Sequence, residues 1–308
     1  MRVLVLGGSG AVGRETITSL RAQGVEAVSG GRNAARTDIV VDLQGPDLIG
    51  LTSAAQHVDV VVNASGQEDP RVAASVASAG AAFVEISATA AYLQQLERRD
   101  WSAPVVLGVG LAPGITNVLA RDVAARSVGP IDIGIVLGAG DAHGPAATAW
   151  SYSLFGQSFV DPAGGGRVRN YTSPRSMLLP GGRVRRLLRA DFADQHTLTR
   201  ELDRPVRSFF GTDDRFSTAL LAVLTWVPGA RGLPAVHLPG GDRWVVLAES
   251  GSGERAWAVG NGQSRATGLA AATAAIRSVG LAAGVHGVQA VLAVEDVDGW
   301  DGITVGRD

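Results

Sequence analysis

The sequence predicts an α/β protein of two domains, an N-terminal doubly wound Rossmann domain and a second α+β domain built on a mainly antiparallel sheet. Three observations predict this fold. A short apolar strand at residues 3–6 runs directly into a glycine-rich turn and an amphipathic helix. Strand and helix patterns then alternate as far as Gly108. Much later, two strand-like runs at residues 244–249 and 256–259 flank Gly251-Ser252-Gly253, a pattern typical of an antiparallel hairpin.

The chain of 308 residues is long enough for two domains. We expect the Rossmann domain to span residues 1–126 and to be completed by a helix and tail at residues 264–308. Residues 127–263 would form a substrate and dimerisation domain. The Ala- and Gly-rich helix expected from Ser264 to about Val279 has a face that allows close packing, and we expect it to pack on the Rossmann domain.

Composition excludes several classes of function. The net charge of −2 gives no electrostatic footprint for nucleic acid or an anionic membrane. An apolar run long enough to cross a membrane is missing, and the chain opens on a strand pattern, so we expect a cytoplasmic protein. Cysteine is absent and all 27 basic residues are arginine, which excludes thiolate chemistry, a lysine Schiff base and a Tyr-x-x-x-Lys catalytic pair. We also find no metal-spaced set of His, Asp and Glu.

The glycine-rich turn has the spacing G-x-G-x-x-G at Gly8, Gly10 and Gly13. In a strand-turn-helix unit such glycines permit a tight turn, close approach of the backbone to a pyrophosphate, and close packing of helix on strand. The pyrophosphate would meet free N–H groups at the positive end of the helix. We therefore expect the cofactor-binding residues to include Gly8, Ser9, Gly10, Ala11, Val12 and Gly13.

The nature of the cofactor is indicated by the end of the second strand, residues 25–29. Where an NAD-specific fold usually places an acidic residue, this chain has Arg32 and Asn33. A guanidinium suits a phosphate dianion, so we predict NADP(H) in preference to NAD(H). The alternative is that Arg32 is an ordinary exposed loop arginine. Asp42, at the C-terminal end of a third strand at residues 39–43, either borders the adenine or is a helix cap or turn residue.

The remaining cofactor contacts are expected at the carboxyl ends of later strands, where ligands bind in such folds. The fourth strand, residues 58–64, ends in Asn63 and Ala64, and Ser65 and Gly66 follow it. Glu85 interrupts the apolar fifth strand, so it is either paired structurally or faces the site. The constrained turn around Pro113, after strand six, opens a helix at Thr116 or Asn117, where nicotinamide and substrate would meet.

Four segments together resemble the saccharopine dehydrogenase-like reductase family: Gly-Gly-Ser-Gly-Ala-Val-Gly at 7–13, Gly-Arg-Asn at 31–33, Val-Val-Asn-Ala at 61–64 and Gly-Leu-Ala-Pro-Gly-Ile-Thr-Asn at 110–117. The resemblance continues more faintly at His143-Gly144 and Ala266-Thr267-Gly268. It implies a Rossmann domain that binds NADP(H) or NAD(H) and a second domain that supplies substrate and dimer contacts. The better-known members join an amine to a carbonyl reductively through an imine.

Proton donors in the second domain are less sharply indicated. His143 and Tyr152 lie close in sequence at a predicted helix from Pro145 to about Phe155, and Tyr171 is a weaker candidate. With Asn117 these give the candidate catalytic residues His143, Tyr152 and Asn117. A mobile loop at residues 161–180 carries three arginines that either bind a substrate carboxylate or are merely solvated. Residues 217–227 suggest a buried or dimer-facing helix.

The leading hypothesis is an NADP(H)-dependent oxidoreductase that reduces the C=N bond of a small amino-acid-derived carboxylate, acting as a homodimer. An iminium substrate is already protonated, so its reduction does not require a strong proton-donating side chain, and the sequence shows no clear one. The alternatives are a carbonyl or enoyl reductase, which would require a donor such as His143 or Tyr152, and a non-catalytic NADP(H) sensor.

Overall fold

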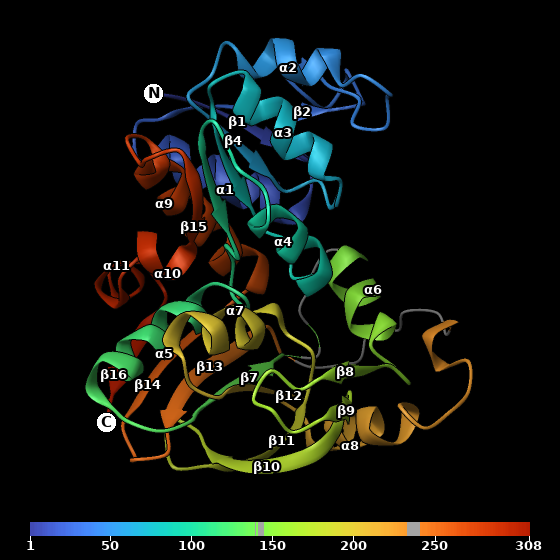
Figure 1. Cartoon of the computed structure of the whole chain (residues 1–308), viewed down its shortest axis with the longest axis vertical. Helices are drawn as coiled ribbons and strands as arrows, with labels where there is room; N and C mark the ends of the chain where they lie inside the picture. The colour runs from blue at the N-terminus through green and yellow to red at the C-terminus, as the bar shows by residue number, and fades with distance from the viewer. Residues whose placement is uncertain (139, 141–144, 233–240) are drawn as a thin grey trace. The chain divides into compact units, whose positions relative to one another are not determined.

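The chain divides into two units in this computed structural model, which describes residues 1–138, 140, 145–232 and 241–308 (Figure 1). Unit 1 comprises Met1–Gly114 and Ser264–Ala293, and unit 2 comprises Ile115–Gln263 and Val294–Asp308. The boundary thus falls after Gly114, where the sequence placed it after residue 126. The last fifteen or so residues belong to unit 2 and not, as expected, to the Rossmann domain.

Unit 1 is built on a fully parallel sheet with the strand order β15-β6-β5-β4-β1-β2-β3. This confirms the predicted doubly wound domain. Its strands are β1 (Arg2–Leu6), β2 (Glu26–Gly31), β3 (Ile39–Val40), β4 (Val60–Asn63), β5 (Ala82–Glu85), β6 (Pro104–Leu107) and β15 (Gly284–Gly287). Its helices are α1 (Ala11–Ala22), α2 (Ile49–Ala55), α3 (Pro70–Ser78), α4 (Ala90–Glu97), α9 (Gln263–Ser278) and α10 (Val288–Val291).

The central strands of unit 1 are buried on both faces, which explains their unbroken apolar sequences. Val3, Leu4 and Val5 of β1 are completely buried, as are the three valines of β4. Helix α1 presents Gly13, Thr16, Ile17 and Leu20 to the sheet, the i, i+3, i+4, i+7 spacing of one helical face. Strand β3 is shorter than predicted, because it ends at Val40 instead of residue 43.

Helix α9 packs closely on helix α1, as the small residues of its sequence predict. A Cβ atom on Gly268 would lie 2.5 Å from the Cβ of Glu15 and 2.9 Å from the backbone nitrogen of Thr16. Five of the alanines that surround Gly268 on this helix are completely buried. The chain then adds β15 beside β6, so the C-terminal segment extends the parallel sheet at its edge (Figure 1).

The described part of unit 2 contains a mixed sheet with the order β10-β11-β12-β7-β13-β14-β16. Only β12 and β7 run parallel; the other neighbouring pairs are antiparallel, as predicted. The strands are β7 (Ile131–Leu137), β8 (Ser158–Val160), β9 (Arg167–Arg169), β10 (Thr172–Leu178), β11 (Val184–Arg189), β12 (Val206–Thr212), β13 (Arg243–Ser250), β14 (Arg255–Asn261) and β16 (Thr304–Arg307). The helices are α5 (Ile115–Arg126), α6 (Pro145–Ser153), α7 (Ala193–Leu202), α8 (Arg215–Leu224), the short η1 (Ala230–Gly232) and α11 (Val294–Asp298).

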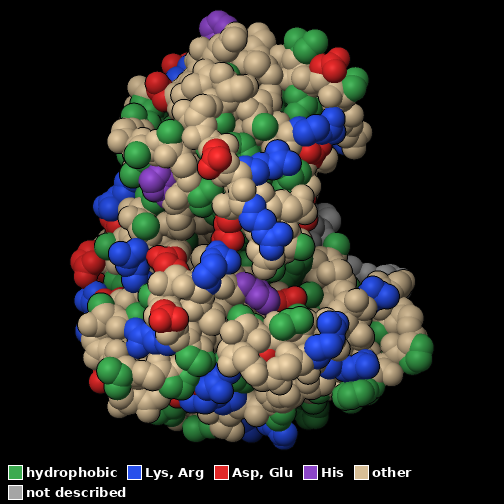
Figure 2. Space-filling view, in the orientation of Figure 1, with side chains coloured by type: hydrophobic (Ala, Val, Ile, Leu, Met, Phe, Trp, Pro, Cys, Tyr) green, Lys and Arg blue, Asp and Glu red, His purple; other side chains and the backbone are tan. Residues whose placement is uncertain are grey.

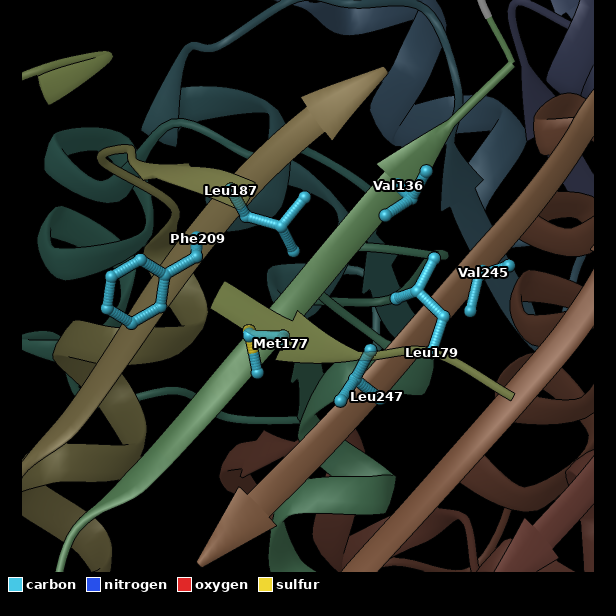
Figure 3. Packing of buried hydrophobic residues seen from close by; sticks show 7 residues of the cluster. All are labelled: Val136, Met177, Leu179, Leu187, Phe209, Val245 and Leu247. Carbon is cyan, nitrogen blue, oxygen red and sulfur yellow. The ribbon is translucent and has the colours of Figure 1, made fainter. Parts of the chain in front are cut away.

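Strand β10 folds back over the face of this sheet and closes its core. Figure 3 shows Met177 and Leu179 packed over the side chains of β7, β11, β12 and β13. Gly134 makes room for this crossing, because a Cβ there would lie 3.0 Å from the sulfur of Met177 and 2.9 Å from a methyl group of Leu247. The register shifts between Thr172 and Arg175, a bulge that lets the strand bend across the sheet.

Charged side chains join the strands beside that core. Asp132 on β7 is 2 % exposed and pairs with Arg207 of β12, whose Nε lies 2.6 Å from the carboxylate. Arg175 of β10 pairs with the same carboxylate and with Glu249 of β13 at 3.1 Å. A buried carboxylate needs such partners, and the two arginines supply them.

Two sequence expectations for unit 2 are wrong. The predicted mobile loop at 161–180 instead contains two strands: β9 pairs with β8, and β10 pairs with β11. The helix predicted at 217–227 forms as α8, and the buried alternative for it is wrong: within α8 only Thr218 is buried, and Phe216 is 85 % exposed. Trp226, which follows α8, is 63 % exposed, and a dimer-facing role for this segment stays a prediction.

The described residues contain no helix that is both long and apolar enough to cross a membrane. On the face drawn in Figure 2, arginine side chains and acidic side chains are interspersed. This distribution agrees with the nearly balanced charges of the sequence.

Candidate functional site

The strand order of unit 1 reverses at β1, which has β2 on one side and β4 on the other. At such a switch point the loops after the two central strands part, and ligands bind at the carboxyl ends of the strands. Here those loops are residues 7–10 after β1 and residues 64–69 after β4. The cofactor residues predicted from both segments are therefore brought together.

The two loops touch because Gly7 has no side chain. Gly7 adopts a φ of +74°, and its carbonyl oxygen accepts a hydrogen bond from the N–H of Gly10 at 2.8 Å. A Cβ on Gly7 would lie 2.5 Å from the carbonyl oxygen of Ala64 and 2.7 Å from the Cα of Ser65. Sequence reasoning missed Gly7, although it begins a second glycine spacing with Gly10 and Gly13.

Gly13 brings helix α1 against this turn. A Cβ on Gly13 would lie only 2.2 Å from the carbonyl oxygen of Gly7 and 2.7 Å from the Cα of Gly8. Both neighbours are backbone, which cannot swing aside. The glycine at position 13 is therefore required for the helix to start where it does.

The start of α1 offers a site for an anion. Its N-cap is Gly10, which has no side chain to cap the helix, and the first turn contains no acidic residue. The N–H groups of a first helical turn lack intrahelical partners and carry the positive end of the dipole. Arg14 adds charge, because its guanidinium donates to the Ser9 carbonyl oxygen at 2.6 Å. These features fit a pyrophosphate.

The residues predicted to bind the adenosine half follow β2 and β3. Arg32 is exposed and donates to Oε1 of Gln44 at 3.1 Å, while Asn33 accepts from the N–H of Ala35. Asp42 accepts from the N–H of Gln44 at 3.0 Å, the turn role that the sequence left open for it. Asp38 is closer to β2: it accepts from both the N–H and the hydroxyl of Ser29, which hold the pKa of its carboxyl below the usual range.

Glu85 is paired with protein groups, which resolves the choice that the sequence left open. Its carboxylate is 2 % exposed and accepts hydrogen bonds from Asn63, from the backbone of Ser87 and from Tyr92. Burial raises the pKa of Glu85 to about 7, although the three hydrogen bonds act in the opposite direction. A group that titrates near neutrality thus lies at the carboxyl end of β5.

The turn that contains Pro113 begins beside Glu85, because the N–H of Val109 donates to the Glu85 carbonyl oxygen at 3.1 Å. The turn is tight: a Cβ on Gly114 would lie 1.8 Å from the carbonyl oxygen of Gly110. The Ala112–Pro113 peptide bond is cis.

The three candidate catalytic residues, His143, Tyr152 and Asn117, belong to unit 2. His143 lies outside the described residues. Asn117 is 2 % exposed in the first turn of α5, next to Thr116. Tyr152 is half-buried on α6, where its ring packs edge-on against Phe155.

Tyr171 is wrong as a proton donor. It is 1 % exposed, its hydroxyl donates to the carbonyl oxygen of Ser151 at 2.8 Å, and burial raises its pKa. The three arginines of residues 161–180 are also engaged. Arg167 donates to the Ser158 carbonyl oxygen and Arg169 to that of Thr225, and Arg175 pairs as described above.

The structure pairs His196 with Asp191, two residues that the sequence analysis did not single out. Nε2 of His196 lies 2.6 Å from a carboxylate oxygen of Asp191, and both side chains are partly exposed. A histidine held by a carboxylate has the composition of a proton-transfer pair. The two residues stand five apart around the start of α7, so an Asp-x-x-x-x-His spacing at a helix start was the available signal. The described residues contain no group of acidic and histidine side chains able to hold a metal ion.

Comparisons with known proteins bear on the fold. Neither a protein-family model nor a curated protein sequence matches the chain. Among solved structures, the chain is similar to apo histidine-tagged saccharopine dehydrogenase (L-Glu forming) from Saccharomyces cerevisiae. That match has a TM-score of 0.62 and 13 % identity, and covers 100 % of this chain and 99 % of that one.

Two other matches have lower TM-scores. One is a mutant meso-dapdh with DAP from Clostridium tetani, with a TM-score of 0.48, 12 % identity and 93 % of each chain covered. The other is an amine dehydrogenase from Mycobacterium smegmatis, with a TM-score of 0.46, 13 % identity and 95 % and 96 % of the two chains covered. The full-length match to the yeast enzyme confirms the predicted resemblance to saccharopine dehydrogenase at the level of the fold.

Proposed function

We propose that this protein is an NADP(H)-dependent oxidoreductase that reduces the C=N bond of a small, amino-acid-derived carboxylate. The observation that carries the proposal is the glycine-lined turn at the start of α1, at the switch point of a parallel sheet. The full-length likeness in fold to saccharopine dehydrogenase supports the choice of reaction class. Fold by itself does not define a substrate.

The residues present fit a dinucleotide. Gly7 and Gly13 let the loop after β4 and the start of α1 pack against the turn after β1. Arg14 and the helix dipole favour the charge of a pyrophosphate at the start of α1. The proposed adenosine contacts are Arg32 for a 2′-phosphate and Asn33 and Asp42 beside it. When bound, the nicotinamide would supply or accept a hydride. The chain itself would orient the two reactants and exclude water.

Proton transfer is the part of the proposal with several candidates. An iminium substrate arrives with its proton, which lowers the demand on an enzyme acid. For the condensation of amine and carbonyl, which releases water and does move protons, we propose His143, Tyr152 and Asn117 as the candidates. His196 with Asp191 is added by the structure as a partly exposed pair.

The test is an NADPH oxidation assay with pooled amino acids, pooled keto acids and aldehydes, or both pools together. We expect oxidation only when both pools are present, because only then does an imine form. Oxidation with carbonyl compounds alone would indicate a carbonyl reductase instead. Tight NADPH binding without turnover in any mixture would favour an NADP(H) sensor.

Replacing Arg32 tests the choice of cofactor. In Arg32→Asp we expect NADPH to bind on the order of 100-fold more weakly, since a charge-assisted contact with the phosphate dianion becomes a repulsion. NADH binding should persist. Isothermal titration with both nucleotides measures the change, and Arg36→Asp controls for a change of loop charge. Unaltered NADPH affinity in Arg32→Asp would show that Arg32 does not hold the 2′-phosphate.

A further inference from the structure

Asn63 and Glu85 are direct neighbours at the carboxyl ends of β4 and β5. They are paired in register in the parallel sheet, and both are buried. Nδ2 of Asn63 donates to Oε2 of Glu85 at 2.7 Å. A buried polar pair at the end of two apolar strands requires an explanation, because burying apolar residues there would cost less free energy.

The orientation of the Asn63 amide is fixed by the loop that follows it. Its Oδ1 accepts from the hydroxyl of Ser65 at 2.6 Å and from the Ser65 N–H at 3.3 Å. Its Nδ2 donates to the carbonyl oxygen of Gln67 at 3.0 Å. A backbone N–H can only donate and a carbonyl can only accept, so the amide cannot be turned over without losing both contacts. Its second N–H therefore points to Glu85.

Glu85 must therefore accept a hydrogen bond from Asn63. Oε2 takes hydrogen bonds from Asn63 and, at 3.1 Å, from the hydroxyl of Tyr92, while Oε1 takes one from the N–H of Ser87 at 2.8 Å. Three donors directed at one carboxyl group match its ionised form. A proton on Oε1 would face the N–H of Ser87, and a proton on Oε2 would require the Tyr92 hydroxyl to turn from donor to acceptor, so either proton would change the network.

The segment held in this way forms one wall of the cofactor turn. Ala64 and Ser65 lie against Gly7, within 2.7 Å of the place where its Cβ would be. Ser65 also accepts from the N–H of Gln67 at 3.2 Å, which keeps the segment compact. We propose that Glu85 is a positioning residue for cofactor binding: its carboxylate, acting through Asn63, holds residues 64–67 in the shape that receives the dinucleotide.

The inference extends to pH. The elements packed around Glu85 present Tyr92 from α4 and Glu68 from the loop after β4; the exposed Glu68 accepts from the Ser87 hydroxyl at 2.5 Å. Glu68 disfavours the charged form of Glu85, whereas Tyr92 and Asn63 favour it. Since burial raises the pKa of Glu85 to about 7, cofactor affinity should follow its ionisation across neutral pH.

The inference rests on the proposed function, and the experiment separates the two. NADPH and NADH affinities are measured by fluorescence titration from acid to alkaline pH, together with the amide shifts of Ser65 and Gln67 in the nucleotide-free protein. In the wild type we expect binding roughly tenfold weaker at pH 6 than at pH 8, because only the ionised form would bind well. In Glu85→Gln the residual pH dependence should be that of the nucleotide phosphates alone, and both amide shifts should lose their titration near neutrality.

Two conservative substitutions near Glu85 should move the midpoint of the affinity profile in opposite directions. Tyr92→Phe removes a donor to the Glu85 carboxylate, so the midpoint of the affinity profile should move to higher pH. Glu68→Gln removes a neighbouring negative charge and keeps an acceptor for Ser87, so the midpoint should move to lower pH. A purely structural role for Glu85 would move neither midpoint.

The outcomes are distinct. Opposite movements of the midpoint in the two variants would support the positioning role. NADPH binding with the same pH profile in wild type and all three variants would overturn it and leave the proposed function intact. Failure of the wild type to bind either nucleotide at any pH would overturn the proposed function, and the role of Glu85 in cofactor binding with it.

Discussion

Gly13→Ala should bind NADPH on the order of 100-fold more weakly than the wild type, because forcing a methyl group into a packed site costs up to about 3 kcal/mol. The new Cβ would lie 2.2 Å from the carbonyl oxygen of Gly7 and 2.7 Å from the Cα of Gly8. Helix α1 would have to withdraw from the turn, and its N–H groups would leave the anion site. Isothermal titration measures the affinity, and circular dichroism shows whether the fold persists.

Gly45→Ala is the matched control. Gly45 lies in the same unit, and a Cβ there would meet no atom within 4 Å. Its NADPH affinity should equal that of the wild type. If Gly13→Ala also retained wild-type affinity, the dinucleotide would not bind at the start of α1, and the observation on which the proposed function depends would be lost.

The second large effect concerns stability. Burial raises the pKa of Glu85 from 4.5 to about 7, so between these values the folded protein holds a proton that the unfolded chain releases. The contribution of this proton to the free energy of unfolding is fully present below pH 4.5 and is lost as pH rises through 7. It amounts to about 3 kcal/mol in unit 1. Relative to Glu85→Gln, the wild type should therefore lose stability by roughly this amount from pH 4.5 to 8.

Hydrogen exchange of the β4 and β5 amides measures this difference, because these buried amides report the opening of unit 1 alone. Asp47→Asn, which removes an exposed carboxyl from the same unit, controls for the loss of one acidic group. A wild-type profile that runs parallel to that of Glu85→Gln would show that Glu85 does not retain a proton near neutral pH.

Much of the fold was predictable because its signals are local. The apolar runs of β1 and β4 can only be buried on both faces, and the 3.6-residue spacing from Gly13 to Leu20 can only be one face of a helix. The hairpin of β13 and β14 was likewise encoded by two strand patterns around Gly251 to Gly253. Local signals failed for residues 161–180, where glycine, proline and serine suggested a loop. There the pairing of β10 with β11 outweighs local preference.

The candidate site divides in the same way. The strand-turn-helix unit and its glycines could be predicted from the sequence alone, because these positions are constrained by the backbone of neighbouring residues. The contact between Gly7 and the loop after β4, and the pairing of Arg175 with Asp132 and Glu249 instead of with a ligand, follow from the fold and could not be predicted from the sequence. The hydrogen bonds that Asn63 and Tyr92 donate to Glu85 are likewise seen only in the structure. Most of these partners are distant in sequence and meet because the two sheets bring separate strands together, an arrangement that no local pattern of residues records.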